Sequence, residues 1–307
     1  MSEDYLWDRS GDVDADIAHL ETVLGELRWK PRGRGQWRWW GLAAAAVLLL
    51  AAGINFYAGR GAVTSWELSL ADGKASAVRS GEVIETGNAM RGRMRSEAVG
   101  EVNIEPDSRL RIVTARKGAE MMTLEHGTIH AFIWAPPTTF VVDTPSAKTV
   151  DLGCQYTLRV DNDGNGFLRV ETGWVAFESQ GVESFIPAEG VCTTRRGRGP
   201  NTPYFEDAPA VLVKGLAEFD RSGDKAALKS VLAAARPRDA FTLWHLLERT
   251  KGAARLAVYK QFAALVNLPA DATREGILRG DQNAMDSAWN ALALGDMSWW
   301  REWQRKW

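Results

Sequence analysis

The fold of this chain is decided by the stretch from residue 140 to residue 177, which contains three segments rich in apolar residues. They read FVVDTPSA (140–147), VDLGCQYTL (150–158) and LRVETGWVAF (168–177). Apolar side chains recur at every second position in this stretch, as at Tyr156, Leu158 and Val160. Because successive side chains of a strand point to opposite faces, this period of two predicts half-buried β-strands.

The same alternation extends on both sides and covers residues 62–192 in short runs. The run VNIEPDSRLRI (102–112), for example, places apolar residues on both sides of a Pro-Asp pair. Gly, Pro, Asp and Asn separate the runs, and these residues are typical of turns. The middle of the chain is therefore predicted to be rich in β-strands.

Taken in order, these segments resemble the FecR domain. VNIEPDSRL (102–110) and LEHGTI (124–129) are similar to its earlier strands, and the segments within residues 140–177 are similar to its core. The resemblance spans roughly residues 80–190 and rests on order and spacing. It implies a bacterial signalling protein with a solenoid-like β sensor domain in the periplasm. A cytoplasmic segment would control an extracytoplasmic-function sigma factor, and a periplasmic or outer-membrane protein would supply the signal.

An uncharged stretch of twenty residues, Trp39–Ala58, precedes the β-rich part. As a helix it would be about 30 Å long, which matches the hydrocarbon thickness of a bilayer. Aromatic residues favour the membrane–water interface, and they flank this stretch at Trp37, Trp39, Trp40, Phe56 and Tyr57. We therefore expect a retained transmembrane helix in the lipid bilayer rather than a buried soluble helix or a cleaved signal peptide.

Basic residues are distributed unequally around this stretch. Five precede it within twenty residues (Arg28, Lys30, Arg32, Arg34 and Arg38), and two follow it (Arg60 and Lys74). The positive-inside rule then places the N-terminus in the cytoplasm. The expected location is the bacterial inner membrane, with a single pass and the bulk of the chain in the periplasm.

The N-terminal segment has apolar residues at helical spacing: Ile17, Leu20, Val23, Leu24 and Leu27. A single helix of this length is marginal in water, so its apolar stripe is expected to meet a partner. The contacts expected with a sigma factor are Trp7, Ile17, Leu20, Leu24 and Leu27. The pattern equally allows packing onto the segment's own aromatic residues or contact with the membrane surface.

Residues 210–307 are rich in Ala and Leu at helical spacing. Ser222-Gly-Asp can open a helix that ends near Pro237, and further helices are expected up to Leu294. They suggest an all-α bundle or a solenoid-like stack. The tail with Trp299, Trp300, Trp303 and Trp307 is expected to cover this helical core or to lie on a membrane.

The sequence thus predicts a multi-domain α+β protein. Its parts are a cytoplasmic amphipathic-helix segment (1–36), a transmembrane helix (37–59), a FecR-like β domain (60–195), a linker (196–212) and a helical domain (213–307).

Candidate metal sites and catalytic motifs are weak. Asp161–Gly166 reads DNDGNG and resembles the start of a calcium loop, but it joins two alternating runs, which favours a hairpin turn. His126 and His130 flank Gly127 in a strand-like run, where four residues span about 13 Å, too far to share a metal. His245 is expected to pack within a helical core. We expect no enzyme, no metal and no cofactor.

Two cysteines, Cys154 and Cys192, fall within the β-rich part. In an oxidising periplasm they could form a disulfide, or they could be two buried free thiols. Strand register cannot be deduced from sequence, so both alternatives stay open.

A net charge of −2 over 307 residues gives no basic surface for direct nucleic-acid binding. The sequence favours an inner-membrane regulator that senses a periplasmic signal and modulates a sigma factor. The alternative is a membrane-anchored periplasmic adaptor that binds envelope proteins and has no sigma-factor role.

Overall fold

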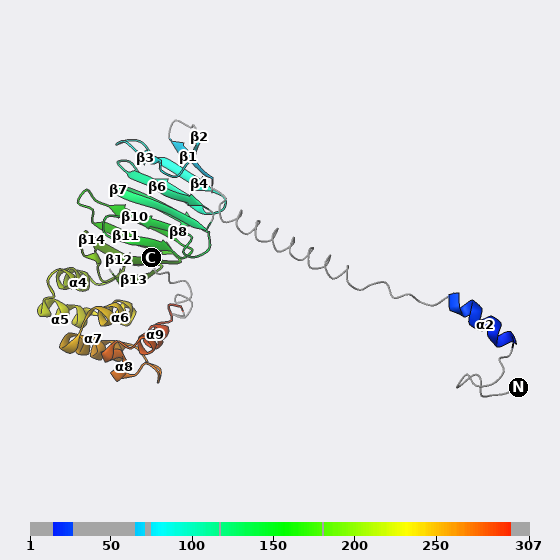
Figure 1. Ribbon diagram of the computed structural model, residues 1–307. Coiled ribbons are helices and arrows are strands. Elements are labelled where there is room, and N and C mark those ends of the chain that lie inside the picture. Colours follow the sequence, from blue (N-terminus) through cyan, green and yellow to red (C-terminus); the bar gives the residue numbers. More distant parts are fainter. Residues whose placement is uncertain (1–14, 27–64, 71–74, 117, 180, 296–307) are drawn as a thin grey trace. The chain divides into compact units, whose positions relative to one another are not determined.

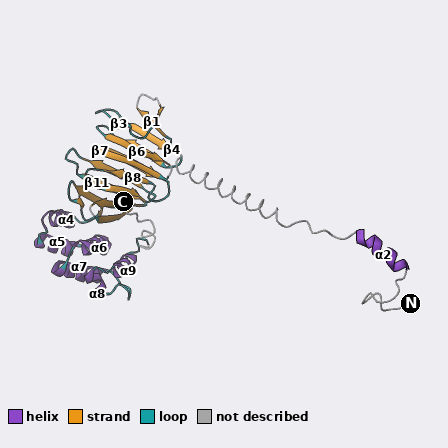
Figure 2. Ribbon diagram, viewed as in Figure 1, coloured by secondary structure: helices purple, strands orange, loops and turns teal. Residues whose placement is uncertain are grey.

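The computed structural model describes residues 15–26, 65–70, 75–116, 118–179 and 181–295. The chain divides into two units, Met1–Ala58 and Gly59–Trp307. In the first unit the described element is helix α2 (Ala15–Glu26). The second unit contains the strands and the remaining helices (Figure 2).

The strands of the second unit form two sheets that share one long strand, β7 (Ala119–Ile133). Sheet A runs β3 (Val83–Glu85), β6 (Arg109–Arg116), β7, β8 (Phe140–Asp143), β9 (Lys148–Asp151), β12 (Trp174–Ser179) and β13 (Val182–Pro187). Sheet B runs β2 (Ala75–Val78), β1 (Trp66–Leu70), β4 (Gly92–Ser96), β5 (Gly100–Ile104), β7, β10 (Gln155–Val160), β11 (Gly166–Thr172) and β14 (Gly190–Arg195). The short strands β15 (Gly199–Pro200) and β16 (Tyr204–Phe205) pair with β14.

Strand β7 changes sheets at Gly127. His126 pairs with Arg109 in sheet A, whereas Gly127 pairs with Val160 in sheet B. Gly127 has φ = 102°, and a Cβ at this position would lie 2.2 Å from the Ser108 hydroxyl. The Ser108 Oγ in turn accepts a hydrogen bond of 2.9 Å from the Thr128 backbone N–H. Only glycine fits both the backbone angle and the close approach, so this residue allows one strand to serve two sheets.

The inward side chains of both sheets form one apolar core. Sheet B contributes Met94, Ile129 and Leu158, and sheet A contributes Leu110 and Phe140, all with at most 1% exposure. The alternating burial of β4, β5 and β10 agrees with the period of two in the sequence. The predicted half-buried strands are therefore confirmed.

The structure corrects the predicted fold in two respects. First, the sheets do not form a solenoid: β7 pairs with β8 in parallel, and the other strand pairs of the described residues are antiparallel. A solenoid stacks parallel rungs, and a period of two is compatible with either arrangement. Second, none of the described helices combines the length and apolar character needed to cross a bilayer. The segment 37–59, for which the transmembrane helix was predicted, lies outside the described residues.

The helices of the second unit gather at one end of the sheets, beside β12 and β13 (Figure 1). They are α4 (Ala210–Ser222), α5 (Lys225–Ala234), the 3-10 helix η1 (Pro237–Asp239), α6 (Ala240–Arg249), α7 (Gly252–Leu265), α8 (Arg274–Arg279) and α9 (Gln282–Asn290). The helix start predicted near Ser222 is confirmed, since the Asp224 carboxylate accepts a 2.7 Å hydrogen bond from the Ala227 N–H.

A second apolar core joins these helices to the outer face of sheet A. The Trp174 ring stacks on Phe185 at 4.5 Å, and Trp289 from α9 packs against both rings. His245 is buried, and its Nε2 lies 3.1 Å from the Phe185 carbonyl oxygen, which confirms the predicted packing role. Sheet A is thus covered on both faces where β9, β12 and β13 lie.

The segment 196–212, expected as a linker, contains β15, β16 and the start of α4. Arg195 pairs with Gly199, and a 2.9 Å hydrogen bond runs from the Arg198 N–H to the Arg195 carbonyl. The Gly-rich sequence of this segment therefore forms a hairpin that returns the chain to β14.

Candidate interaction surface on sheet B

The outer face of sheet B is regular, polar and exposed, unlike the helix-covered part of sheet A. It consists of the side chains that alternate with the core residues of β4, β5, β7, β10 and β11. Asn103, His130, Thr157 and Arg169 lie side by side across four of these strands, because the register pairs each with the next. Cross-strand neighbours on one face are close enough to contact each other.

Ion pairs connect many of the charged groups on this face. Arg93 donates a hydrogen bond of 2.6 Å to Glu101, which lowers the pKa of that carboxyl group. Arg91 lies 3.0 Å from Glu105, and Arg169 lies 2.9 Å from Glu206. Exposed pairs of this kind contribute about 0 to 1 kcal/mol each. Their main effect is to fix the positions of the side chains that a partner would meet.

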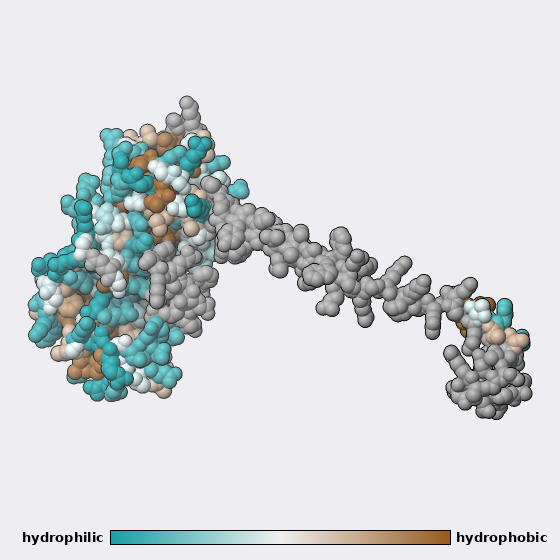
Figure 3. All heavy atoms as spheres, in the orientation of Figure 1, coloured by the Kyte–Doolittle hydropathy of each residue, from teal (hydrophilic) through white to brown (hydrophobic). Residues whose placement is uncertain are grey.

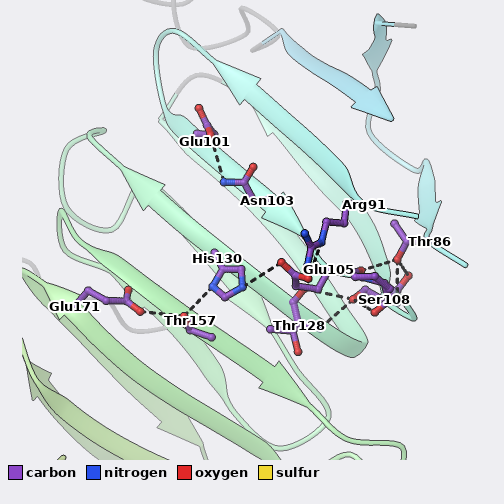
Figure 4. A network of polar contacts seen from close by, with 11 residues as sticks. Thr86, Arg91, Glu101, Asn103, Glu105, Ser108, Thr128, His130, Thr157 and Glu171 are labelled. Carbon is purple, nitrogen blue, oxygen red and sulfur yellow. Dashed lines mark hydrogen bonds and ion pairs between the residues drawn. The ribbon is translucent and has the colours of Figure 1, made fainter. Parts of the chain in front are cut away.

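His130 occupies the centre of this polar network (Figure 4). Its Nδ1 lies 2.9 Å from the Thr157 hydroxyl, which donates to Glu171 at 2.9 Å. Since the Thr157 proton points to Glu171, the Thr157 oxygen accepts from His130 and Nδ1 carries a proton. On the other side, His130 Nε2 lies 3.5 Å from Glu105. The ring is therefore held between the Thr157 hydroxyl and the Glu105 carboxylate.

An exposed aromatic pair lies at one end of this face. The Phe132 and Trp134 side chains are 52% and 42% exposed, and their rings meet edge to face at 5.5 Å. The Trp134 Nε1–H donates a 2.8 Å hydrogen bond to the Glu97 carbonyl, which fixes the indole. Exposed and preorganised aromatic rings are typical of the residues that contribute most to protein interfaces. This pair was not predicted from the sequence. The four consecutive apolar residues AFIW (131–134) were a signal for it, because they place apolar side chains on both faces of the strand.

The predicted partner contacts of the N-terminal segment are described only in part. Leu20 and Leu24 are exposed on α2, at 56% and 59%. Ile17 belongs to α2, but its side chain lies outside the described residues, as do Trp7 and Leu27. The predicted membrane-interface residues Trp37, Trp39, Trp40, Phe56 and Tyr57 also lie outside the described residues.

Both cysteines are buried free thiols in the structure, so the disulfide is not formed. The Cys154 S–H donates to the Asp151 carboxylate, and the Cys192 S–H donates to the Asn201 carbonyl at 3.3 Å. Burial raises the pKa of Cys154 well above its usual value and raises that of Cys192 to about 12. Neither thiol is therefore in the ionised, nucleophilic form at neutral pH.

The candidate metal ligands do not come together. His126 and His130 lie on the same strand but in different sheets. The predicted hairpin turn is confirmed, because the Asp161 carboxylate accepts hydrogen bonds from the backbone N–H groups of Asp163 and Asn165, each at 2.9 Å. Across the described ranges, no group of three or more His, Cys, Asp or Glu residues is placed to hold a metal ion.

Comparisons with known proteins give limited similarity. No protein-family model matches the chain, and no curated protein matches it. The resemblance to the FecR domain therefore rests on the residues quoted above. Two crystal structures, at 1.65 and 2.50 Å, are similar in fold to part of the chain; both are described as a "putative anti-sigma factor" from Parabacteroides distasonis. Each has a TM-score of 0.36 and 16% identity, and the match covers 44% of this chain and 64% of the other.

Proposed function

We propose that this chain is an anti-sigma-type regulator in which the segment around α2 binds a sigma factor. The observation that carries the proposal is the apolar stripe of α2. Leu20, Val23 and Leu24 are three and four residues apart, so they share one face of the helix. Their side chains are 56%, 49% and 59% exposed, and Figure 3 shows apolar residues at the surface of α2.

An exposed stripe of this kind is suited to binding a groove on a partner. Burying one Leu or Val side chain contributes about 1.5 to 3 kcal/mol, and a 12-residue helix is marginal alone in water. A partner that covers the stripe would therefore stabilise the helix as it binds, which is the helix-in-groove mode of recognition.

The outer face of sheet B is the surface that we assign to the incoming signal. Its aromatic pair, Phe132 and Trp134, is exposed and fixed in place, and paired charges surround it. The proposal assigns binding roles, and no catalytic step, to this face and to α2.

A finer version of the proposal follows from the resemblance to the FecR domain. The sheet-bearing unit would act in the periplasm of a bacterium, at the inner membrane, and the N-terminal segment would act in the cytoplasm on an extracytoplasmic-function sigma factor. The excess of basic residues before Trp39 supports this orientation. Reporter enzymes that are active only outside the cytoplasm, fused to either end of the chain, would test it: activity is expected only from the C-terminal fusion.

The regulatory role is tested by substitutions on the two sides of α2. Leu20→Glu with Leu24→Glu should have the same effect as deleting the gene on the transcripts that depend on the candidate sigma factor. Ala18→Glu with Thr22→Glu is the matched control, because both residues are exposed and lie on the opposite side of the helix. If deletion of the gene leaves those transcripts unchanged, the proposal is wrong.

A second candidate function is an adaptor that binds envelope proteins and has no sigma-factor role. The exposed aromatic pair of sheet B favours it, since it offers a binding surface independent of α2. Replacing residues 1–27 with an unrelated soluble segment separates the two functions. An adaptor would keep its phenotype, whereas a regulator that acts through α2 would lose it.

A further inference from the structure

A groove of about 760 Å³ lies at the far edge of sheet B's outer face, away from β4 and β5. Its floor is formed by three side chains on adjacent strands: Arg159 on β10, Phe167 on β11 and Thr193 on β14. The register pairs Phe167 directly with both of the others. Ala217 from α4 lines the groove as well.

The two arginines of this groove are not paired. Within the described part of the chain, the side chains of Arg159 and Arg195 make no hydrogen bond or ion pair, whereas Arg93 and Arg169 on the same sheet each meet a carboxylate. Two inter-strand spacings and two residues along β14 separate Arg159 from Arg195, so their Cα atoms are about 12 Å apart. The groove thus presents two separate guanidinium groups that can bind carboxylates with paired N–H donors.

One carboxylate, that of Asp161, also lines the groove. It is occupied by its own turn, since it accepts from two backbone N–H groups and from the Asn165 amide at 3.1 Å. The charge of Asp161 is therefore fixed within the hairpin and is not paired with either arginine.

The floor adds a ring surface and neutral polar groups. Phe167 is partly exposed, as are Thr193 and Asn201. The Asn201 side-chain N–H donates to the Thr193 hydroxyl oxygen at 2.8 Å, which leaves the Thr193 hydroxyl proton and the Asn201 side-chain oxygen available to a ligand. An aromatic ring with neighbouring hydroxyl and amide groups is suited to binding a sugar ring and its hydroxyl groups. The two arginines favour a ligand that is negatively charged.

We propose that this groove binds an acidic glycan, with Phe167 under a sugar ring and with Arg159 and Arg195 each binding a carboxylate of the glycan. The separation of the arginines favours an oligosaccharide with several carboxylates over a single small anion. The inference goes beyond the proposed function, and it depends on neither α2 nor the aromatic pair.

Binding of defined oligosaccharides to the full chain tests the proposal. Titration with tetragalacturonate, followed by calorimetry, should give saturable binding that weakens as salt is added, because the contacts are ionic. Maltotetraose, a neutral chain of the same length, should bind at least about tenfold more weakly, since each lost charge-assisted hydrogen bond costs about that factor.

Substitutions then locate the site. Arg159→Gln and Arg195→Gln should each weaken tetragalacturonate binding about tenfold, and Phe167→Ala should weaken it as well. Arg91→Gln, directly before β4 and paired with Glu105 outside the groove, is the matched control and should bind as the wild type does. Thermal unfolding of each variant checks that it is folded.

The proposal would be overturned by the absence of tetragalacturonate binding, by equal binding of maltotetraose, or by equal loss of binding in the Arg91 control. The proposal would also be overturned if inorganic phosphate, at the same concentration of charge, displaced tetragalacturonate completely, because the groove would then be a site for simple anions.

Discussion

Asp151 gives the sharpest prediction, because its carboxyl group is buried and has no cation beside it. The residue is 1% exposed at the end of β9, and its carboxylate accepts hydrogen bonds from the Gly153 N–H at 2.7 Å and from the Cys154 thiol. Burial raises the pKa of Asp151 from 3.8 to about 7. We therefore expect the folded protein to hold this proton at a pH where the unfolded chain has released it.

The direction and size of the pH effect on stability follow from the pKa values of Asp151 in the folded and unfolded states. Between pH 4 and pH 7 the folded state binds more protons than the unfolded state, so the free energy of unfolding falls as pH rises. The pKa values 3.8 and about 7 differ by about 3, and at about 1.4 kcal/mol per pH unit the loss is about 4 kcal/mol. It is complete above pH 7, where the folded state also carries the charge.

The substitution Asp151→Asn removes this titration and keeps an acceptor for the Gly153 N–H. Urea unfolding, followed by tryptophan fluorescence from pH 4.5 to pH 8, should show the variant gaining stability relative to the wild type as pH rises, by about 3 kcal/mol over this range. Asp161→Asn is the control: hydrogen bonds within its turn lower the pKa of Asp161, so its effect should be constant over this range. A constant difference between Asp151→Asn and the wild type at every pH would refute the reasoning.

Three further predictions concern Gly127, His245 and the aromatic pair. Gly127→Ala should lower the free energy of unfolding by about 3 kcal/mol, because the added Cβ would meet Ser108. The control Gly181→Ala has open space around it and should lower the free energy of unfolding by about 1 kcal/mol. Equal losses in urea unfolding would contradict this prediction. Burial lowers the pKa of His245 well below 6.5, so stability should fall as pH drops below 6.5, and His245→Gln should remove that slope. Trp134→Ala should leave the unfolding free energy within about 1 kcal/mol of the wild type and abolish binding of the envelope partner; unimpaired binding would exclude Trp134 from the interface.

The sequence predicted the strands well and their arrangement poorly. Alternation at Tyr156, Leu158 and Val160 indicated a strand, since burial on one face dictates a period of two. The same period does not say which strand pairs with which, so a solenoid and two facing sheets were equally compatible with it. The conformation of Gly127, which carries β7 from one sheet to the other, depends on contact with Ser108 and could not be predicted from local pattern.

The sequence also contained little information on which faces of the strands are covered by other elements. The consecutive apolar residues Val175, Ala176 and Phe177 fit a strand that is buried on both faces, and the structure places helices over the outer one. Helix ends were predicted more closely, because caps such as Asp224 act within one turn. The apolar run AFIW (131–134) was a signal that Phe132 leaves the alternating pattern, but the exposure of its side chain depends on which face of sheet B remains uncovered.

The central claim is that the apolar stripe of α2 binds a sigma factor, and co-purification with the best candidate sigma factor of the same organism tests it most directly. The full chain and the Ala18→Glu, Thr22→Glu control should retain the sigma factor, and the Leu20→Glu, Leu24→Glu variant should lose it by at least about tenfold, because two buried leucines contribute several kcal/mol. Equal retention by all three proteins, or retention by none, would contradict the claim.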